Sequence, residues 1–253
     1  MKKILLFALL VFSVAQLWAQ DELVEITAKQ SKEDRNFRIP LIGEEAPSFT
    51  AQSTNGIINF PGDYGKKWKI LFSHPQDFTP VCSSEILELA NLQGEFDKLG
   101  VKLVVVSTDP VETHTEWKKA LEGLDYKGRP NAKIKFPLVD DDKLVVAKKY
   151  GMIHSSTNTT RDVRGVFIID PNDKISAIFF YPMRVGRNTD ELLRIVTALQ
   201  VTAKGGVATP VDWRAGNDLL VPVPPKVDPS TKVVPDGYYQ LAWFMWYKKS
   251  DVK

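Results

Sequence analysis

The order of the apolar segments constrains the fold more than any other feature of this sequence. A short apolar run at 68–73 is followed by a helical pattern, and a second run at 101–106 is followed by another. Apolar runs of this length between turn residues are typical of buried strands. A third run at 165–169 leads through a turn into a returning segment at 174–181. Two strand–helix units followed by a hairpin predict a mixed central sheet covered by helices.

The helices of this pattern have recognisable ends. Thr79 and Pro80 are typical of an N-cap and a first helical position, and Gly100 of a C-terminal stop. Between these ends, apolar residues recur at spacings of three and four and form one stripe: Leu89, Leu92, Phe96 and Leu99. Further helices are expected from Asp109-Pro110 to Leu121, over 144–150 with a stop at Gly151, and after the Asn188 cap. We therefore predict an α/β chain with a thioredoxin-like fold, a mixed central sheet flanked by helices, and a C-terminal extension.

Changes in composition divide the chain. Residues 20–37 are charged, lack apolar periodicity and are predicted to be a linker, whereas 38–200 form the predicted thioredoxin-like domain. Residues 201–253 form a C-terminal arm in which repeated prolines exclude a long regular element. The arm has too many aromatic residues for a solvated tail. It either folds onto its own domain or packs on a second subunit.

Residues 1–19 have the order of a secretory signal peptide. Two lysines after Met1 precede an apolar run from Ile4 to Phe12, and small residues follow. The run is shorter than the roughly 20 residues that span a bilayer, which disfavours an uncleaved anchor. Cleavage after Ala15 and cleavage after Ala19 both remain open. We expect an exported protein, periplasmic or secreted, with no stable membrane association once the leader is removed.

The charge balance excludes one large class of partners. Lysine and arginine number 33 against 31 acidic residues, so the chain has a net charge of +2 at pH 7. A nucleic-acid-binding protein normally carries a basic surplus or stripe. We therefore expect no nucleic-acid partner.

Cys82 is the only cysteine in the chain, so an intrachain disulfide is impossible. Such a thiol is structural, forms an intermolecular bond, or is reactive. Its predicted position in the first turn after Thr79 places it beside unpaired backbone N–H groups and the positive end of the helix dipole, which favour a thiolate. Pro75 and Pro80 stiffen the preceding loop. The residues predict an activated thiolate in a small polar pocket.

Several motifs resemble the peroxiredoxin family. The loop at 74–82, His-Pro-Gln-Asp-Phe-Thr-Pro-Val-Cys, resembles the family's active-site loop, and in particular that of the single-cysteine, peroxiredoxin-six type branch. Residues 162–171 resemble the strand that carries the family's active-site arginine, and 208–213 resemble the start of the branch's C-terminal arm. Tyr181-Pro182 and 186–188 resemble a later loop. The resemblance covers roughly residues 40 to 225.

The resemblance implies roles for particular residues. Cys82 would be the peroxidatic nucleophile, and Thr79 would hydrogen-bond the sulfur and the peroxide. Pro75 would shield the site from water, and Arg164 would stabilise the thiolate and the charge that develops on the peroxide oxygens. Supporting roles are expected for three more residues: Glu85, which would orient an arginine; His74, which would orient the loop; and Arg187, a second arginine.

The implied reaction reduces hydrogen peroxide and organic hydroperoxides. The Cys82 thiolate attacks one peroxide oxygen, water or alcohol leaves, and the sulfur becomes a sulfenic acid. Because the chain has no second cysteine, an external thiol must resolve this species: a small thiol or a thioredoxin-like protein. The resemblance implies no cofactor. Together with the aromatic arm, it favours a homodimer.

Two other functions use the same thiol. A thiol–disulfide oxidoreductase normally needs a Cys-x-x-Cys pair, and the residue three after Cys82 is Glu85, so this alternative is poor. A redox-sensing or chaperone-like protein switched by Cys82 oxidation stays open.

The remaining polar residues carry blander expectations. His114 and His154 have no companions at metal-ligand spacing, so no metal site is predicted. Residues 140–142, three successive aspartates, lack the glycine and distal glutamate of a calcium loop and predict a solvated turn. Arg161, in a polar segment, is expected to be a surface charge.

Overall fold

The centre of the molecule is a five-stranded mixed sheet in the order β7-β4-β3-β8-β9. Its middle strand β3 (Trp68–Ser73) is parallel to β4 (Val101–Ser107) and antiparallel to β8 (Arg164–Ile169). The edges are β7 (Leu138–Asp140) and β9 (Ile175–Tyr181). The predicted sheet is confirmed, apart from β7, whose three residues are too few to give a sequence pattern.

This computed structural model describes residues 38–158, 160–223, 225 and 234–250. The predicted leader at 1–19 and linker at 20–37 lie outside the described residues. Within the described ranges, no helix combines the length and apolar character needed to span a bilayer.

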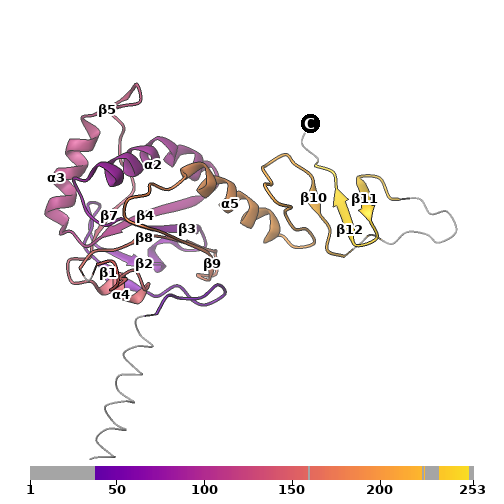
Figure 1. Ribbon diagram of the computed structural model, residues 1–253, viewed down its shortest axis with the longest axis horizontal. Coiled ribbons are helices and arrows are strands. Elements are labelled where there is room, and N and C mark those ends of the chain that lie inside the picture. Colours follow the sequence, from indigo (N-terminus) through magenta and orange to yellow (C-terminus); the bar gives the residue numbers. More distant parts are fainter. Residues whose placement is uncertain (1–37, 159, 224, 226–233, 251–253) are drawn as a thin grey trace, which may run out of the picture.

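Helices cover both faces of the sheet (Figure 1). On one face lie α2 (Pro80–Lys98), α3 (Val111–Glu122) and α5 (Thr189–Thr202), which share one apolar cluster. On the other face, α4 (Val145–Lys149) contributes to a second cluster. That cluster is completed by a short antiparallel pair, β1 (Phe49–Ala51) and β2 (Ile58–Phe60), with the 3₁₀ turn η1 (Gly62–Tyr64) after it.

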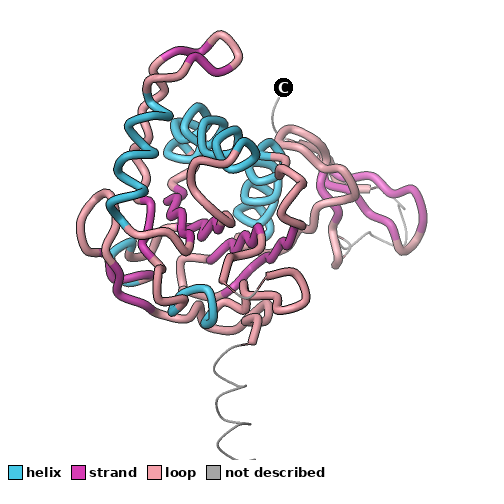
Figure 2. Tube along the Cα trace, turned by 60° about the vertical axis from the view of Figure 1, so that its left-hand side comes forward, coloured by secondary structure: helices cyan, strands magenta, loops and turns pink. Residues whose placement is uncertain are grey.

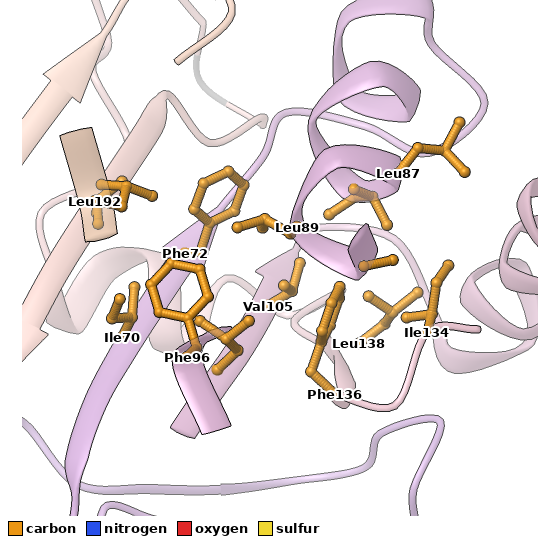
Figure 3. Close-up of a cluster of buried hydrophobic side chains, with 14 of the residues drawn as sticks. Ile70, Phe72, Leu87, Leu89, Phe96, Val105, Ile134, Phe136, Leu138 and Leu192 are labelled. Carbon is orange, nitrogen blue, oxygen red and sulfur yellow. The ribbon is translucent and has the colours of Figure 1, made fainter. Parts of the chain in front are cut away.

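Strand β3 supplies side chains to both clusters. Ile70 and Phe72 pack under α2 and α5, whereas Leu71 faces α4, because successive strand residues point to opposite faces. Figure 3 shows the first of these clusters, to which Phe72 of β3, Phe96 of α2 and Val105 of β4 belong. Burial on both faces explains why β3 is a continuous apolar run in the sequence.

The helix ends differ in detail from the sequence expectation. Thr79 occupies the N-cap of α2, but its hydroxyl donates to the Gln76 carbonyl (2.9 Å) instead of capping a backbone N–H. Pro110, not Asp109, is the N-cap of α3. Asn188 does cap α5, because its Oδ1 accepts hydrogen bonds from two backbone N–H groups of the first turn.

The C-terminal arm projects from the end of α5, away from the central sheet (Figures 1 and 2). It forms a small sheet in the order β10-β12-β11: β10 (Leu219–Leu220), β12 (Met245–Lys248) and β11 (Tyr238–Ala242). These strands have two to five residues, which fits the expected lack of long elements. A second projection is the hairpin of β5 (Asp125–Tyr126) and β6 (Arg129–Pro130).

Gly151, which follows α4, allows a tight packing contact that no other residue can make. Its φ is +61°, and a Cβ there would lie 2.6 Å from the backbone nitrogen of Ile39. Gly100 has a similar φ of +68° but no neighbouring atom within 4 Å of the same position. A side chain at either glycine would strain the backbone, but only at Gly151 would it also clash with a neighbour.

We predict that Gly151→Ala destabilises the fold more than Gly100→Ala. The left-handed backbone costs an alanine about 1 kcal/mol at either site, and the clash with Ile39 adds about 1–3 kcal/mol in Gly151→Ala. Urea unfolding followed by tryptophan fluorescence measures both free energies. Equal losses in the two variants would show that the segment at Ile39 moves away without cost.

Candidate active site

Cys82 lies in the first turn of α2, immediately after the loop that leaves β3. Its side chain is buried, with 1% of the residue exposed, and it is a free thiol. Arg164, the first residue of β8, directs Nη1 to the Cys82 sulfur at 3.3 Å. Because β8 runs antiparallel to β3, the start of β8 lies beside the end of β3. The sheet thus brings together two residues far apart in the sequence.

Glu85 joins Arg164 to a second arginine beneath the thiol. One turn after Cys82, its Oε2 accepts hydrogen bonds from Nη1 of Arg164 and Nη2 of Arg187, both at 2.7 Å. The other oxygen, Oε1, accepts from the Arg187 backbone N–H (2.8 Å) and Nε (2.9 Å). All three side chains are at most 3% exposed. The predicted supporting residues Glu85 and Arg187 therefore lie in the site with Arg164.

Backbone carbonyls and an aromatic ring fix the two guanidinium groups. Arg164 donates from Nε and Nη2 to the Met183 carbonyl at 3.0 and 2.6 Å. Arg187 donates from Nη1 to the carbonyls of Ser73 (2.7 Å) and Gly165 (2.9 Å), and its guanidinium lies 3.3 Å from the centre of the Phe72 ring. Cation–π contact suits a desolvated arginine.

The charges in this cluster do not cancel. Burial opposes the ionisation of Glu85, but the hydrogen bonds and charge of Arg187 and the charge of Arg164 outweigh it and hold the pKa of this carboxyl below its usual value. Burial lowers the pKa of Arg187, with Glu85 opposing the shift. Two guanidinium groups share one carboxylate, so one positive charge is left for an anion at the Cys82 sulfur. The arrangement can hold a buried thiolate and direct donors at a bound oxygen.

Two protein-family descriptions match this chain. Residues 42–178 match the AhpC/TSA family, and residues 198–236 match the C-terminal domain of 1-Cys peroxiredoxin. The chain belongs to the peroxiredoxin family. The predicted resemblance is confirmed, including its single-cysteine branch.

Individual peroxiredoxins match most of this chain and nearly all of their own length. The sequence is 48% identical over 219 residues to a peroxiredoxin of Methanosarcina mazei, across 85% of this chain and 100% of that protein. It is 41% identical over 205 residues to peroxiredoxin-6 of Bos taurus, across 79% of this chain and 90% of that protein. A solved structure of the yeast mitochondrial 1-Cys peroxiredoxin covers 84% of this chain and 100% of its own, with a TM-score of 0.72 and 38% identity. The protein is accordingly a thiol-dependent peroxidase with a thioredoxin-like fold.

The other predicted site residues of this peroxiredoxin are less directly arranged. Pro75 is buried within the loop, whereas the Thr79 hydroxyl donates to the Gln76 carbonyl and makes no hydrogen bond to the Cys82 sulfur. His74 is fully buried, and its ring nitrogens form no hydrogen bond among the described residues. Burial lowers the pKa of His74 to about 4, with Asp77 acting in the opposite direction, so its ring is neutral at pH 7.

Sequence reasoning missed the residues that anchor the active-site loop at 74–79. The Asp77 backbone N–H donates to Oδ2 of Asp109 at 2.8 Å, and Arg161 donates to the other oxygen of Asp109 at 2.8 Å. Arg161, expected to be a solvated surface charge, is instead half-buried and paired with Asp109, and Asp109 holds the loop instead of capping α3. Asp77 and Asp109 lie close together because they follow β3 and β4, whose ends the parallel pairing places side by side.

Two further aspartates near this edge are buried. Asp141 accepts hydrogen bonds from the backbone N–H groups of Val146 (2.8 Å) and Ala147 (2.7 Å), so the expected solvated turn at 140–142 is wrong for Asp141. Burial raises the pKa of Asp141 to about 6. Both carboxyl oxygens of Asp162 are buried without a hydrogen-bond partner in the described part of the chain. Burial raises the pKa of Asp162 well above its usual value, which favours the neutral acid.

The described ranges hold no group of three or more His, Cys, Asp or Glu side chains arranged to bind a metal ion. His154 lies in a loop, with its ring 5.2 Å from the Phe180 ring. His114, in α3, contacts the active-site loop and is treated below.

Proposed function

We propose that Cys82 is the peroxidatic residue of this thiol-dependent peroxidase and that Arg164 activates it. The observation that carries the proposal is the 3.3 Å contact between Arg164 Nη1 and the buried sulfur, within a cluster that has one positive charge in excess. An anionic sulfur is the nucleophilic form of cysteine, and a buried anion needs such a partner. Glu85 holds Arg164 in place, and Arg187 holds Glu85.

The chemistry follows from these contacts. The Cys82 thiolate attacks one oxygen of the peroxide, a sulfur–oxygen bond forms and the oxygen–oxygen bond breaks. The departing oxygen takes a proton and leaves as water, or as an alcohol when the substrate is an organic hydroperoxide. Arg164 stabilises the charge that moves onto the departing oxygen. Thr79 joins this step by turning its half-buried hydroxyl from the Gln76 carbonyl to the peroxide, while Pro75 limits water access.

External thiols return Cys82 to its reduced state: one condenses with the sulfenic acid, which releases water and leaves a mixed disulfide, and a second attacks that disulfide and frees the Cys82 thiol. The chain has no second cysteine, so the sulfenic acid has no partner within it. A solved relative, the yeast mitochondrial 1-Cys peroxiredoxin, has its thiol resolved via glutathione/thioredoxin systems. We extend this pattern to the present chain and assign the reductant as a small thiol or a thioredoxin-like protein. Only 1% of Cys82 is exposed. The sulfur must therefore become accessible before the external thiol can reach it.

Catalytic turnover is the first expected outcome. With hydrogen peroxide or an organic hydroperoxide in excess, the protein consumes many equivalents when glutathione or a thioredoxin system is added, and Cys82→Ser consumes none. Peroxide loss per mole of protein measures this directly. Loss of a single equivalent with every reductant would instead favour a redox sensor switched by Cys82 oxidation. The panel of thiols also identifies the electron donor.

Arg164→Ala is expected to slow Cys82 oxidation by about 10²–10³-fold, because it removes a buried donor aimed at the developing charge. Arg164→Lys retains the charge but loses the planar fork that binds Cys82, Glu85 and Met183 together, so its rate should fall between alanine and wild type. Intact mass after rapid quenching measures the added oxygen in a single turnover without any reductant. An unchanged rate in Arg164→Ala would remove Arg164 from the mechanism.

The tip of the C-terminal arm supports a proposal about assembly. Trp243 and Phe244, between β11 and β12, are 83% and 71% exposed, and such apolar surface favours a partner. We assign this role to a second copy in a homodimer.

The sequence of residues 1–19 supports export to the periplasm or the medium.

Purification after expression with the native leader tests both proposals. The mature protein is expected outside the cytoplasm, with a mass that corresponds to cleavage after Ala15 or Ala19, and with the molar mass of a dimer by light scattering. Trp243→Ser/Phe244→Ser should shift the sample towards monomer while far-ultraviolet circular dichroism is unchanged. Retention of Met1 in a cytoplasmic fraction would refute export, and a monomeric wild type would refute the dimer.

A further inference from the structure

A buried histidine outside the reacting centre contacts the active-site loop. His114, in the first turns of α3, is 0% exposed. Its Nδ1 lies 2.6 Å from Oδ2 of Asp77, and its Nε2 lies 3.0 Å from the Val139 carbonyl in β7. Asp77 is equally enclosed, and it stands midway between Pro75 and Thr79. His114 therefore connects the loop to the edge of the central sheet.

The two contacts of His114 fit a ring that is protonated on both nitrogens. The Val139 carbonyl can only accept, so Nε2 carries a proton, and the Asp77 carboxylate accepts from Nδ1. Burial opposes this charged form, but the hydrogen bond and charge of Asp77 outweigh it and raise the pKa of His114. Among the described residues, the charge of Asp109 also raises the pKa of His114, and the centre of the His74 ring lies 6.4 Å from that of His114. A charged hydrogen bond in a buried site is a strong positional constraint.

The loop needs such a constraint because it contains an unfavourable backbone conformation. Phe78, the residue after Asp77, has a φ of +53°, a region that bulky side chains rarely occupy, and its side chain is 57% exposed. Its ring centre lies 6.5 Å from that of Trp117 in α3, but more than half of the residue is exposed, so packing holds it only in part. Strained residues persist when their surroundings fix them, and they cluster at functional sites. Here Asp77 is fixed twice, through its backbone N–H by Asp109 and through its carboxylate by His114.

We propose that His114 is a positioning residue for the peroxidase reaction. Through Asp77, it holds the loop in the form that starts α2 at Pro80 and seats Cys82 against Arg164. His114 does not touch the sulfur, and none of its contacts involves a reacting atom. The inference rests on Cys82 as the nucleophile, which the Cys82→Ser experiment tests separately.

Two amide substitutions separate the two hydrogen bonds of His114. The amide nitrogen of asparagine lies close to the position of Nδ1, so His114→Asn can keep the bond to Asp77 and loses the one to Val139. The amide nitrogen of glutamine lies close to the position of Nε2, so His114→Gln keeps the bond to Val139 and loses the one to Asp77. Each variant loses one buried hydrogen bond, and His114→Gln loses the charge-assisted one, so its thermal unfolding midpoint should be the lower of the two. The rates are therefore compared at a temperature at which circular dichroism shows both variants to be folded.

The rate of Cys82 oxidation by hydrogen peroxide, measured in a single turnover by intact mass, decides between a positioning role and a purely structural one. We expect His114→Gln to lose at least about tenfold and His114→Asn to stay within about threefold of wild type, because a small displacement of a reacting group is costly. Equal rates in the two variants, whether both wild-type or both slow, would overturn the proposal.

Asp77→Ala removes the same hydrogen bond from the other side and covers the case in which His114→Gln does not fold. It should lose at least about tenfold in the oxidation rate. Combined with His114→Gln, it should lose little more, because the two substitutions delete one shared contact. A wild-type rate in Asp77→Ala, or losses that multiply in the double variant, would also overturn the proposal.

Discussion

The site depends on the hydrogen-bonded ion pairs that the buried Glu85 carboxylate makes with Arg164 and Arg187. Taking three charges out of water is expensive, and only close, saturated hydrogen bonding offsets that cost. Glu85 provides it by accepting from both guanidinium groups and from the Arg187 backbone. Since Arg187 also donates to carbonyls of Ser73 and Gly165, the same network ties α2 to β3 and β8. Such an arrangement fixes geometry more than it adds stability.

The loop before Cys82 is governed by the opposite condition, local strain. Phe78 adopts a left-handed conformation and is largely exposed, so the contact of its ring with Trp117 holds the loop only in part. Its shape comes from Asp77, which is tied to Asp109 and His114 on two different elements. The ion cluster that contacts the thiol and the anchored loop that precedes it in the chain together explain how a first-turn cysteine is kept buried and oriented.

The sequence predicted the parts of this protein that follow from local patterns. Strand β3 and helix α2 have apolar periodicity and turn residues at their ends, and the motif around Cys82 led to Arg164 through its resemblance to peroxiredoxins. Contacts made across the sheet carry no such signal. Arg161 lies in a polar stretch that also fits a surface loop, and only the fold reveals its bond to Asp109. The same holds for Asp141, whose burial depends on the start of α4.

The register in which β3 and β8 pair determines whether Arg164 can reach Cys82. Arg164 reaches Cys82 because β8 pairs with β3 in a register that sets Val166 opposite Phe72. Side chains alternate along a strand, so a slip of one residue would turn Arg164 towards the layer of α4, on the far side of the sheet from the sulfur. The buried apolar residues on both faces of β8 resist such a slip. The hydrophobic core thus encodes the alignment of the nucleophile with its arginine, although Cys82 is the one member of the first apolar cluster to which a chemical role is assigned.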